Sequence, residues 1–551
     1  MSHCRLALLA FALVLLLTPI AATAQQPSQP PPQEQVGGRV VSQTDKHPIP
    51  HAKITLTNTR DQKIAATAIA DDEGRFRFDP VPPGKYRMNG SATHYLPANY
   101  QQHGQYATAI VTGAGLATDS LELQLNPVSS ISGHVFDNGE PVQRASVMLF
   151  REDPSSAAHV TQSQTSQTND DGAYEFNRVA PGRYFLVANG TPWYAVHPPL
   201  DRPGFQTQFR VAVDPALDVA YPPVYYPDSL EPSGATPITL HGGETPTADL
   251  QMHPVHAVTL TLQLPPGEVR NNSPGPQLFR SIFGIEEPAF TQNQSFNSNG
   301  TTTITISGIT PGQYSLRDFA NNGIPGRSRP VDLTTSVTTA DAADQSATAS
   351  LTVTAHTTSG ASLPTQLQVS LRSLPSNQSM NAKLNEKGVA EFPTVPTGDY
   401  RIAFLGSPRA TNILTLAVEG KPAADKQLHI TNAAHLSVEM TLVQGAFQVE
   451  GYVRHESQPV PGVFVALVPA DADTDLDLFR RYQSDLDGSF TFNNVVPGNY
   501  IVIALDDPAE DLRWTDLPTI MKYLQHGMPL SVPANGSSPV RLADPISAQP
   551  R

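Results

Sequence analysis

One short pattern recurs five times and constrains the fold of this 551-residue chain more than any other feature. A turn that ends in glycine is followed by a short alternating strand and then by a second turn that ends in Gly-x-Tyr. Four copies place their two glycines ten residues apart, and the third copy is two residues longer. Successive copies are much too widely spaced for a solenoid repeat, so each copy indicates a separate small domain.

The first turn of the fifth copy, DLDG at residues 485–488, has two interpretations. It could begin a calcium loop, but such a loop needs further ligands and a late glutamate. Phe490 and Phe492 instead follow at the alternating positions of a strand that faces a core. Because Asp and Asn cap tight turns through the local backbone, and Gly supplies positive φ, we predict a β-hairpin in which Asp485 caps the turn.

The second turn places glycine where positive φ is expected and tyrosine at the start of the next strand. A tyrosine there can pack its ring inward and bond its hydroxyl to a nearby backbone group, as in a tyrosine corner. We therefore predict purely structural roles for ten residues: Gly84, Tyr86, Gly182, Tyr184, Gly312, Tyr314, Gly398, Tyr400, Gly498 and Tyr500.

Around each copy, short apolar-alternating segments are separated by turn residues, which is typical of β-sandwiches. The sequence predicts an all-β chain, a tandem array of about five seven-stranded Greek-key β-sandwich modules. A short helix is predicted after Asp516 in the last module. The predicted modules 1 to 5 span residues 36–127, 128–256, 257–347, 348–443 and 444–548.

The N-terminal residues 1–24 resemble a signal peptide, because Arg5 precedes an apolar run and a small-x-small site ends at Ala24. Residues 25–35 form a Pro/Gln linker, and the single cysteine, Cys4, lies before the apolar run. We expect an exported mature chain without disulfides or thiolate metal sites, either secreted, periplasmic or associated with the outer surface.

The net charge of −15, without basic clusters, argues against nucleic acid as a partner. No segment after the signal peptide is apolar and long enough to predict a transmembrane helix in the mature chain.

The segments ISGHVFDNGEPVQRASVMLF from Ile131 and VEGYVRHESQPVPGVFVALV from Val449, each followed by its hairpin copy, carry a family resemblance. They resemble the carboxypeptidase regulatory-like domain, a transthyretin-like (prealbumin-like) sandwich close to the starch-binding-like fold. Modules 1, 2 and 5 match this pattern well, and modules 3 and 4 match it in part. The resemblance implies a module that bacteria append to secreted peptidases, carbohydrate-active proteins and outer-membrane receptors, with a polysaccharide or an envelope protein as partner.

The stretch HGGE, His241 to Glu244, has the His-x-x-Glu spacing of zinc metallocarboxypeptidases, and His356 follows at a plausible distance. However, it falls where the equivalent blocks of other modules have a hairpin turn, and the chain shows no βαβ pattern. We therefore predict no catalytic residue, no metal ligand and no cofactor.

Aromatic residues concentrate in module 2, where TPWYAVHPP and YPPVYYPD occur. Flat sugar faces stack on such rings, so Trp193, Tyr194, Tyr225 and Tyr226 are the candidate ligand-binding residues. The alternative is that these rings seal the strand ends between modules.

The sequence thus favours an exported, non-catalytic scaffold that binds or spaces something at the bacterial cell envelope. A carbohydrate-binding protein that uses the module 2 aromatics is the alternative, and a metallocarboxypeptidase is the least favoured.

Overall fold

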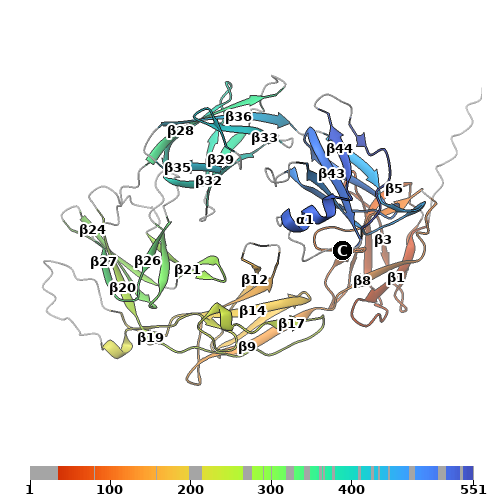
Figure 1. Cartoon of the computed structure of the whole chain (residues 1–551). Coiled ribbons are helices and arrows are strands. Elements are labelled where there is room, and N and C mark those ends of the chain that lie inside the picture. Colours follow the sequence, from red (N-terminus) through yellow and green to blue (C-terminus); the bar gives the residue numbers. More distant parts are fainter. Residues whose placement is uncertain are drawn as a thin grey trace, which may run out of the picture.

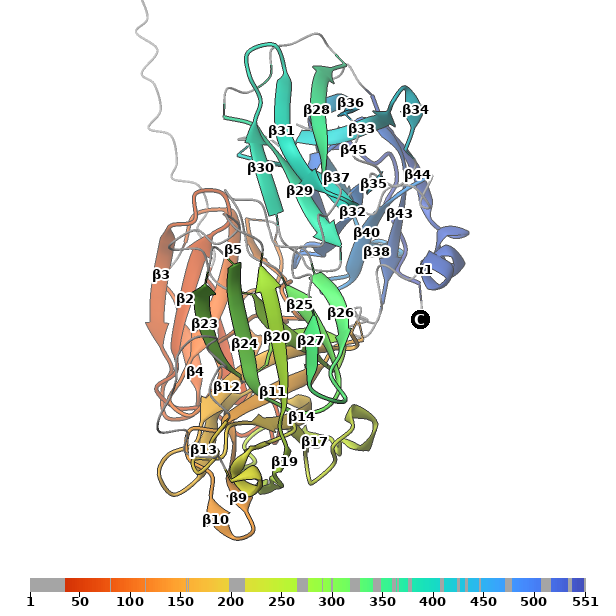
Figure 2. The same ribbon diagram turned by 90° about the vertical axis from the view of Figure 1, so that its left-hand side faces the viewer.

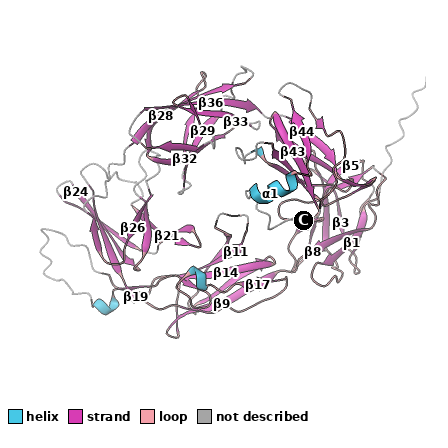
Figure 3. Cartoon of the chain, viewed as in Figure 1, coloured by secondary structure: helices cyan, strands magenta, loops and turns pink. Residues whose placement is uncertain are grey.

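The computed structural model describes residues 35–79, 81–113, 115–154, 156, 158–197, 214–264, 276–289, 291–298, 301–317, 328–339, 348–358, 363, 366–374, 379–406, 411–423, 427–431, 435–444, 447–470, 478–506, 517–533 and 538–549. Within this part of the chain, strands form nearly all regular structure (Figure 3). Its helices are α1 (Leu517–Leu524) and two short 3-10 turns, η1 (Pro215–Leu217) and η2 (Pro232–Gly234). The predicted signal peptide, residues 1–24, lies outside the described residues.

Modules 1 and 2 each pair one sheet against another. In module 1 the first sheet contains β1 (Gly37–Ser42), β4 (Arg75–Arg77) and β8 (Leu121–Leu125), and the second contains β2 (Lys53–Asn58), β3 (Ile64–Ile69), β5 (Gly84–Ser91), β6 (Ala98–Asn99) and β7 (Ile110–Thr112). In module 2 the first sheet contains β9 (Ser129–Asp137), β10 (Glu140–Pro141), β13 (Ala173–Val179) and β18 (Leu250–Gln251), the second contains β11 (Ser146–Glu152), β12 (Val160–Gln167), β14 (Gly182–Asn189), β16 (Val224–Tyr225) and β17 (Ile238–Leu240), and β15 (Val219–Ala220) pairs with β19 (Val255–His256).

Modules 3 and 4 have the same two-sheet build, although their sequences fit the family pattern only in part. Module 3 contains β20 (Val258–Leu264), β23 (Gln292–Ser298), β24 (Thr301–Ile309) and β27 (Val337–Thr339) in one sheet, and β21 (Gln277–Ile282), β22 (Ile285–Pro288), β25 (Gln313–Arg317) and β26 (Ser328–Asp332) in the other. Module 4 contains β28 (Thr348–Thr357), β31 (Val389–Pro396), β33 (Thr411–Val418), β34 (Lys421–Pro422) and β36 (His435–Gln444) in one sheet, and β29 (Gln368–Leu374), β30 (Ser379–Lys383), β32 (Gly398–Leu405) and β35 (Gln427–Ile430) in the other.

Module 5 completes the array and carries the predicted helix, α1. Its sheets contain β37 (Phe447–Tyr452), β42 (Ser489–Val495) and β45 (Val540–Arg541) on one side and β40 (Phe464–Pro469), β41 (Arg480–Gln483), β43 (Gly498–Leu505) and β44 (Met528–Val532) on the other, with a small pair of β38 (Arg454–His455) and β39 (Gln458–Pro459). The prediction of an all-β tandem array of sandwiches is therefore confirmed. The seven-strand count and the module boundaries stay predictions.

All five modules share a core of strand pairings, although β23 in module 3 and β33 and β34 in module 4 are added to the first sheet. The first strand pairs antiparallel with the strand after the first turn of the pattern, and in parallel with the last strand or, in module 2, with β18. In the second sheet, the strand that follows the Gly-x-Tyr turn pairs antiparallel with the second strand or its equivalent. The repeated strand lies in the first sheet and the strand after the corner lies in the second sheet in every module, so the corner of the repeated pattern encodes a point where the chain passes from one sheet to the other.

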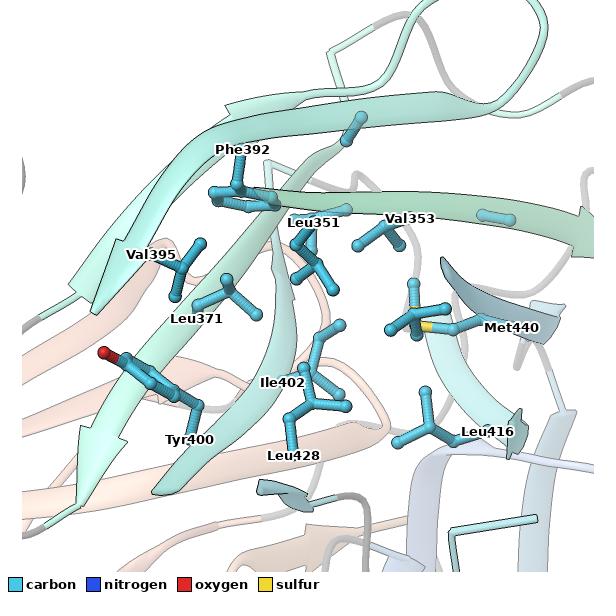
Figure 4. Close-up of a cluster of buried hydrophobic side chains, with 14 of the residues drawn as sticks. Leu351, Val353, Leu371, Phe392, Val395, Tyr400, Ile402, Leu416, Leu428 and Met440 are labelled. Carbon is cyan, nitrogen blue, oxygen red and sulfur yellow. The ribbon is translucent and has the colours of Figure 1, made fainter. Parts of the chain in front are cut away.

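Each module has its own hydrophobic core between its sheets. Figure 4 shows the core of module 4, in which Phe392 and Val395 from β31 face Leu371, Ile402 and Tyr400 from the opposite sheet. Strict alternation, as in β9 where every second residue is buried, directs one face of a strand inward. The core of each small domain therefore replaces the disulfides that the mature sequence is not expected to form.

In modules 2 and 5 the second sheet is buried on its outer face as well as on the face toward the core. All six residues of β40 are buried. On the outer face of this sheet, Ile520 of α1 packs with Ala466, Val468 and Ile503, and Tyr106 of module 1 meets Phe464. Full burial of one such isoleucine side chain stabilises by roughly 1.5–3 kcal/mol. In Figure 1 the five modules follow one another around a ring, in which the blue module 5 lies beside the red module 1. Figure 2 shows the molecule from the side, with the green module 3 toward the viewer. None of the described helices is long and apolar enough to span a bilayer.

Candidate functional site

The most exposed aromatic ring among the predicted ligand-binding residues is that of Trp193. This residue is 85% exposed, and its ring meets the ring of Tyr194 edge-on, with centroids 5.8 Å apart. A large apolar side chain so open to solvent has one flat face available for a ligand.

Tyr194 is held from behind by a buried carboxylate. The hydroxyls of Tyr194 and Tyr221 both donate to Oδ2 of Asp137, at 2.9 and 2.7 Å, and Asp137 is only 7% exposed. Burial, followed by the hydrogen bond and the negative charge of Asp137, raises the pKa of Tyr194. The tyrosine therefore stays a neutral donor, and this bond fixes its ring beside Trp193.

The other two predicted ligand-binding residues are placed differently. Tyr225 is 3% exposed and packs against Phe283 of module 3, with ring centroids 5.1 Å apart. Tyr226 is half-buried and packs against the module 2 core. For Tyr225 this is the arrangement that the alternative interpretation expected, a ring that seals a contact between modules. The exposed Trp193 and the buried Tyr225 do not form one open platform.

Phe283 lies in the two-residue turn between β21 and β22, an element that the sequence analysis missed. Phe283 and Gly284 both have positive φ, 51° and 82°, like Asn138 and Gly139 of the β9–β10 turn at 49° and 87°. Asn tolerates this conformation, whereas a bulky residue there is an outlier. The strain is compensated because the Phe283 ring fills a recess on module 2. That recess is formed by Phe150, Phe185 and Tyr225, with centroids 5.1–5.4 Å away.

A second contact fixes module 3 on module 2. Nδ1 of His197 lies 2.7 Å from Oδ1 of Asp218, and the His197 side chain is 1% exposed. Gly308 of β24 packs on the same imidazole, so closely that a Cβ on Gly308 would lie 2.6 Å from Nε2 of His197. Modules 2 and 3 therefore meet through fitted side chains on both sides.

The HGGE stretch forms a bend between β17 and β18, not the hairpin turn that the sequence predicts, because these two strands belong to different sheets. Oε1 of Glu244 accepts the backbone N–H of His241 at 2.9 Å, and Oε2 accepts that of Gly242 at 2.6 Å. Partial burial would raise the pKa of Glu244, but the backbone N–H groups of His241, Glu244 and Gly242 outweigh it and lower the pKa to about 2. Among the described residues no group of three or more His, Cys, Asp or Glu side chains is arranged to hold a metal ion.

The five tyrosines of the repeated pattern have one geometry. Each hydroxyl donates to the carbonyl oxygen four residues earlier, at 2.7–2.9 Å: Tyr86 to Pro82, Tyr184 to Ala180, Tyr314 to Thr310, Tyr400 to Pro396 and Tyr500 to Val496. The glycine two positions earlier has a φ of 151–159° in modules 2 to 5, at Gly182, Gly312, Gly398 and Gly498. Gly84 of module 1 departs from the expected positive φ. There the Thr112 hydroxyl spans the turn instead, since it accepts from Gly84 N and donates to the Pro82 carbonyl.

A tight turn is present at residues 485–488, but the predicted hairpin is not, because β41 and β42 on either side of the turn belong to different sheets and do not pair. Asp485 does not cap this turn through its side chain. In the corresponding turns of modules 1, 2 and 4 the equivalent Asp71, Asn169 and Asn385 are exposed, and each accepts the backbone N–H groups two and four residues later. In module 5, Asp487 accepts the N–H of Ser489, and the Asp485 carboxylate points to module 1. The prediction for Asp485 is therefore wrong, because a partner distant in sequence takes the place of the local backbone.

Comparison with known proteins shows a family match in the first part of the chain. The model of the carboxypeptidase regulatory-like domain matches residues 35–115 and 130–253. Colossin-A of Dictyostelium discoideum is 28% identical over 172 residues, which cover 28% of this chain and 2% of that protein. This chain thus spans a very small part of the curated relative it matches.

Solved structures give weaker similarities. The TIE protein of Bacillus anthracis is 12% identical with 76% of each chain covered and a TM-score of 0.18. A streptococcal ancillary pilin is 12% identical over 54% of this chain and 100% of its own, with a TM-score of 0.21. TM-scores this low do not support a conclusion about this protein. The family match and the shared strand pairings do, and the protein is a tandem array of β-sandwiches that is similar to the carboxypeptidase regulatory-like domain over residues 35–115 and 130–253.

Proposed function

We propose that this protein is an exported, non-catalytic scaffold that binds or spaces other molecules at the bacterial cell envelope. The observation that carries the proposal is the fitted contact of Phe283 with module 2, because a strained turn residue is kept where it fixes two modules in one orientation. The repeated polar residues of the pattern support the same function, since their hydroxyls and carboxylates bond the backbone of turns and corners.

Export is tested by producing the full chain in a Gram-negative bacterium and fractionating the cells. We expect a mature protein that begins at Gln25 in the periplasm, on the surface or in the medium. An unprocessed protein confined to the cytoplasm would contradict the proposal. Metal analysis of the same purified protein tests the least favoured function, because stoichiometric zinc would support a metallopeptidase.

Carbohydrate binding is the second candidate function, and the 85% exposure of Trp193 favours it. One exposed ring contributes roughly 1 kcal/mol, so binding to a single sugar chain would be weak. The test compares retention on insoluble polysaccharides for the parent, Trp193→Ala and Tyr452→Ala, which removes another exposed ring, in module 5. Loss of retention in Trp193→Ala alone supports a sugar site, whereas a parent that is not retained on any glycan leaves the scaffold without sugar binding.

A further inference from the structure

The turn between β41 and β42 of module 5 contacts module 1, although these modules lie at opposite ends of the sequence. Nζ of Lys85, on β5, lies 2.6 Å from Oδ2 of Asp485, which is 400 positions later. The same ammonium donates to Oγ of Ser489 at 2.5 Å. The Asp485 side chain is fully buried, and that of Lys85 is 33% exposed. The ion pair therefore exists only while module 5 is docked on module 1.

The backbone of module 1 also contacts this turn. Leu486 N donates to the carbonyl oxygen of Ala109 at 2.9 Å, and Ala109 N donates to Oδ1 of Asp485 at 3.3 Å. The Leu486 side chain packs against the hydrophobic core of module 1. Apolar contact and main-chain pairing thus accompany the ion pair, and together they fix the position of the turn on module 1.

Three consecutive polar residues of module 5, Gln483, Ser484 and Asp485, are at most 1% exposed. Nε2 of Gln483 donates to the carbonyl oxygen of Gln101 at 2.6 Å and to Oγ1 of Thr108 at 2.9 Å. Thr108 Oγ1 in turn lies 3.2 Å from the carbonyl oxygen of Ser484. The Ser484 side chain bonds Val460 and Val463 within module 5, whereas the Gln483 and Asp485 side chains bond module 1. Because buried polar groups without partners are costly, these two side chains indicate a specific interface.

Aromatic side chains also contribute to the contact between modules 1 and 5. The Tyr106 ring of module 1 meets Phe464 of module 5 edge-on at 5.3 Å, and the Arg481 guanidinium lies 5.8 Å from the Tyr106 centroid. Burial raises the pKa of the Asp485 carboxyl, and Lys85 and the Ala109 N–H oppose that change. Without module 1 this turn would carry an acidic side chain with no cation beside it.

Closure of the ring is favoured by contacts elsewhere in the chain. Phe283 and His197 hold module 3 on module 2, so a large part of the path from module 1 to module 5 is already ordered. Fewer freely jointed connections mean a smaller entropy loss on closure and a higher effective concentration of module 5 near module 1.

We propose that module 1 is a binding surface for module 5 of the same chain, and that this self-recognition keeps the ring closed even when the covalent path through modules 2 to 4 is cut. The partner that fits this surface is the turn between β41 and β42, with buried Gln483, Ser484 and Asp485 followed by Leu486. The inference does not depend on what the scaffold carries, so failure of the sugar or export tests leaves it unaffected.

The test uses the full mature chain with a specific protease site inserted between β27 and β28. After cleavage, modules 1–3 and modules 4–5 are separate polypeptides. We expect the two pieces to elute together in gel filtration at micromolar concentration. Pieces of the parent that elute apart would overturn the proposal.

Two variants, one from each side of the interface, test whether the ion pair of Lys85 and Asp485 holds the two pieces together. Asp485→Lys and Lys85→Glu should each weaken the association of the cleaved pieces by at least about thirtyfold. Asn385→Lys, at the equivalent exposed position of module 4, is the matched control and should leave the pieces together. Lys85→Glu alters a partly exposed residue, so circular dichroism should show both pieces folded. Association that withstands both substitutions would overturn the assignment of the ion pair.

Discussion

The hydroxyl of Tyr500 donates a 2.8 Å hydrogen bond to the carbonyl oxygen of Val496, at the corner where the chain leaves the repeated strand for the second sheet of module 5. Both residues are at most 2% exposed. Bonds of the same kind in the other four modules show that the corner is stabilised by its own side chain.

Removal of this hydroxyl should destabilise module 5. Tyr500→Phe retains the buried ring but takes away the donor, so the free energy of unfolding should fall by about 1–2 kcal/mol. Hydrogen exchange of peptides from β42 and β43 measures the effect. Tyr452→Phe, at a 45% exposed position in the same module, is the control and should leave these rates unchanged.

Substitutions at two glycines of module 2 should distinguish the energetic cost of backbone strain from that of a steric clash. Gly139 and Gly172 both have positive φ, but a Cβ on Gly139 meets no atom within 4 Å, whereas one on Gly172 would lie 2.7 Å from the Val135 carbonyl oxygen. Gly139→Ala should therefore cost about 1 kcal/mol, and Gly172→Ala roughly 2–4 kcal/mol. Chemical denaturation followed by hydrogen exchange in module 2 gives both values, and equal costs would contradict the steric argument.

Phe283→Asn should favour the conformation of the β21–β22 turn and at the same time weaken the contact between modules 2 and 3. Asn suits the positive φ of 51°, so the β21–β22 hairpin should not be weakened, but the recess on module 2 loses its ring. Because Phe283 is only half-buried, the loss should be smaller than for a core aromatic residue, about 1–3 kcal/mol. It should appear as faster hydrogen exchange around Tyr225.

Phe283→Leu keeps an apolar side chain in the recess and should have a smaller effect than Phe283→Asn. If Phe283→Asn leaves exchange around Tyr225 unchanged, the ring does not hold modules 2 and 3 together.

Glu244 should make the HGGE bend sensitive to acid. The pKa of its carboxyl is lowered to about 2 from an ordinary value of 4.5, so the ionised form stabilises the folded bend. This contribution is complete above the ordinary value and is lost as the pH falls through about 2. Between pH 5 and pH 2 the parent should lose more stability in module 2 than Glu244→Gln, which lacks the titrating group. Equal losses in urea denaturation would show that the backbone N–H groups do not stabilise the carboxylate.

The sandwich architecture could be predicted from the sequence because its determinants are local. Turn glycines, alternating strands and the corner tyrosines act over a few residues, and they recur in each module. Full burial of β40 also has a signal in the sequence, since GVFVALVP is continuously apolar while KITLTN in β2 alternates. What covers the second face could not be predicted, because α1 covers it in module 5 and Phe283 of the next module does so in module 2.

The candidate sites were harder to predict for the same reason. Trp193 and Tyr225 belong to similar aromatic segments, and only the position of module 3 makes one ring exposed and the other buried. Asp485 occupies the place of Asp71 and Asn169 in the repeated pattern, and the choice between its own turn and Lys85 depends on a residue 400 positions away. No local pattern contains that information.

The closed ring also has a mechanical consequence. A force that pulls modules 1 and 5 apart loads the contact around Lys85 and Asp485 before it stretches the route through the three modules between them. That contact is held by side chains and a few main-chain bonds, whereas each sandwich is held by its whole core. Tension would therefore open the ring and release the slack stored in modules 2 to 4, so that the protein lengthens under load while every β-sandwich stays folded.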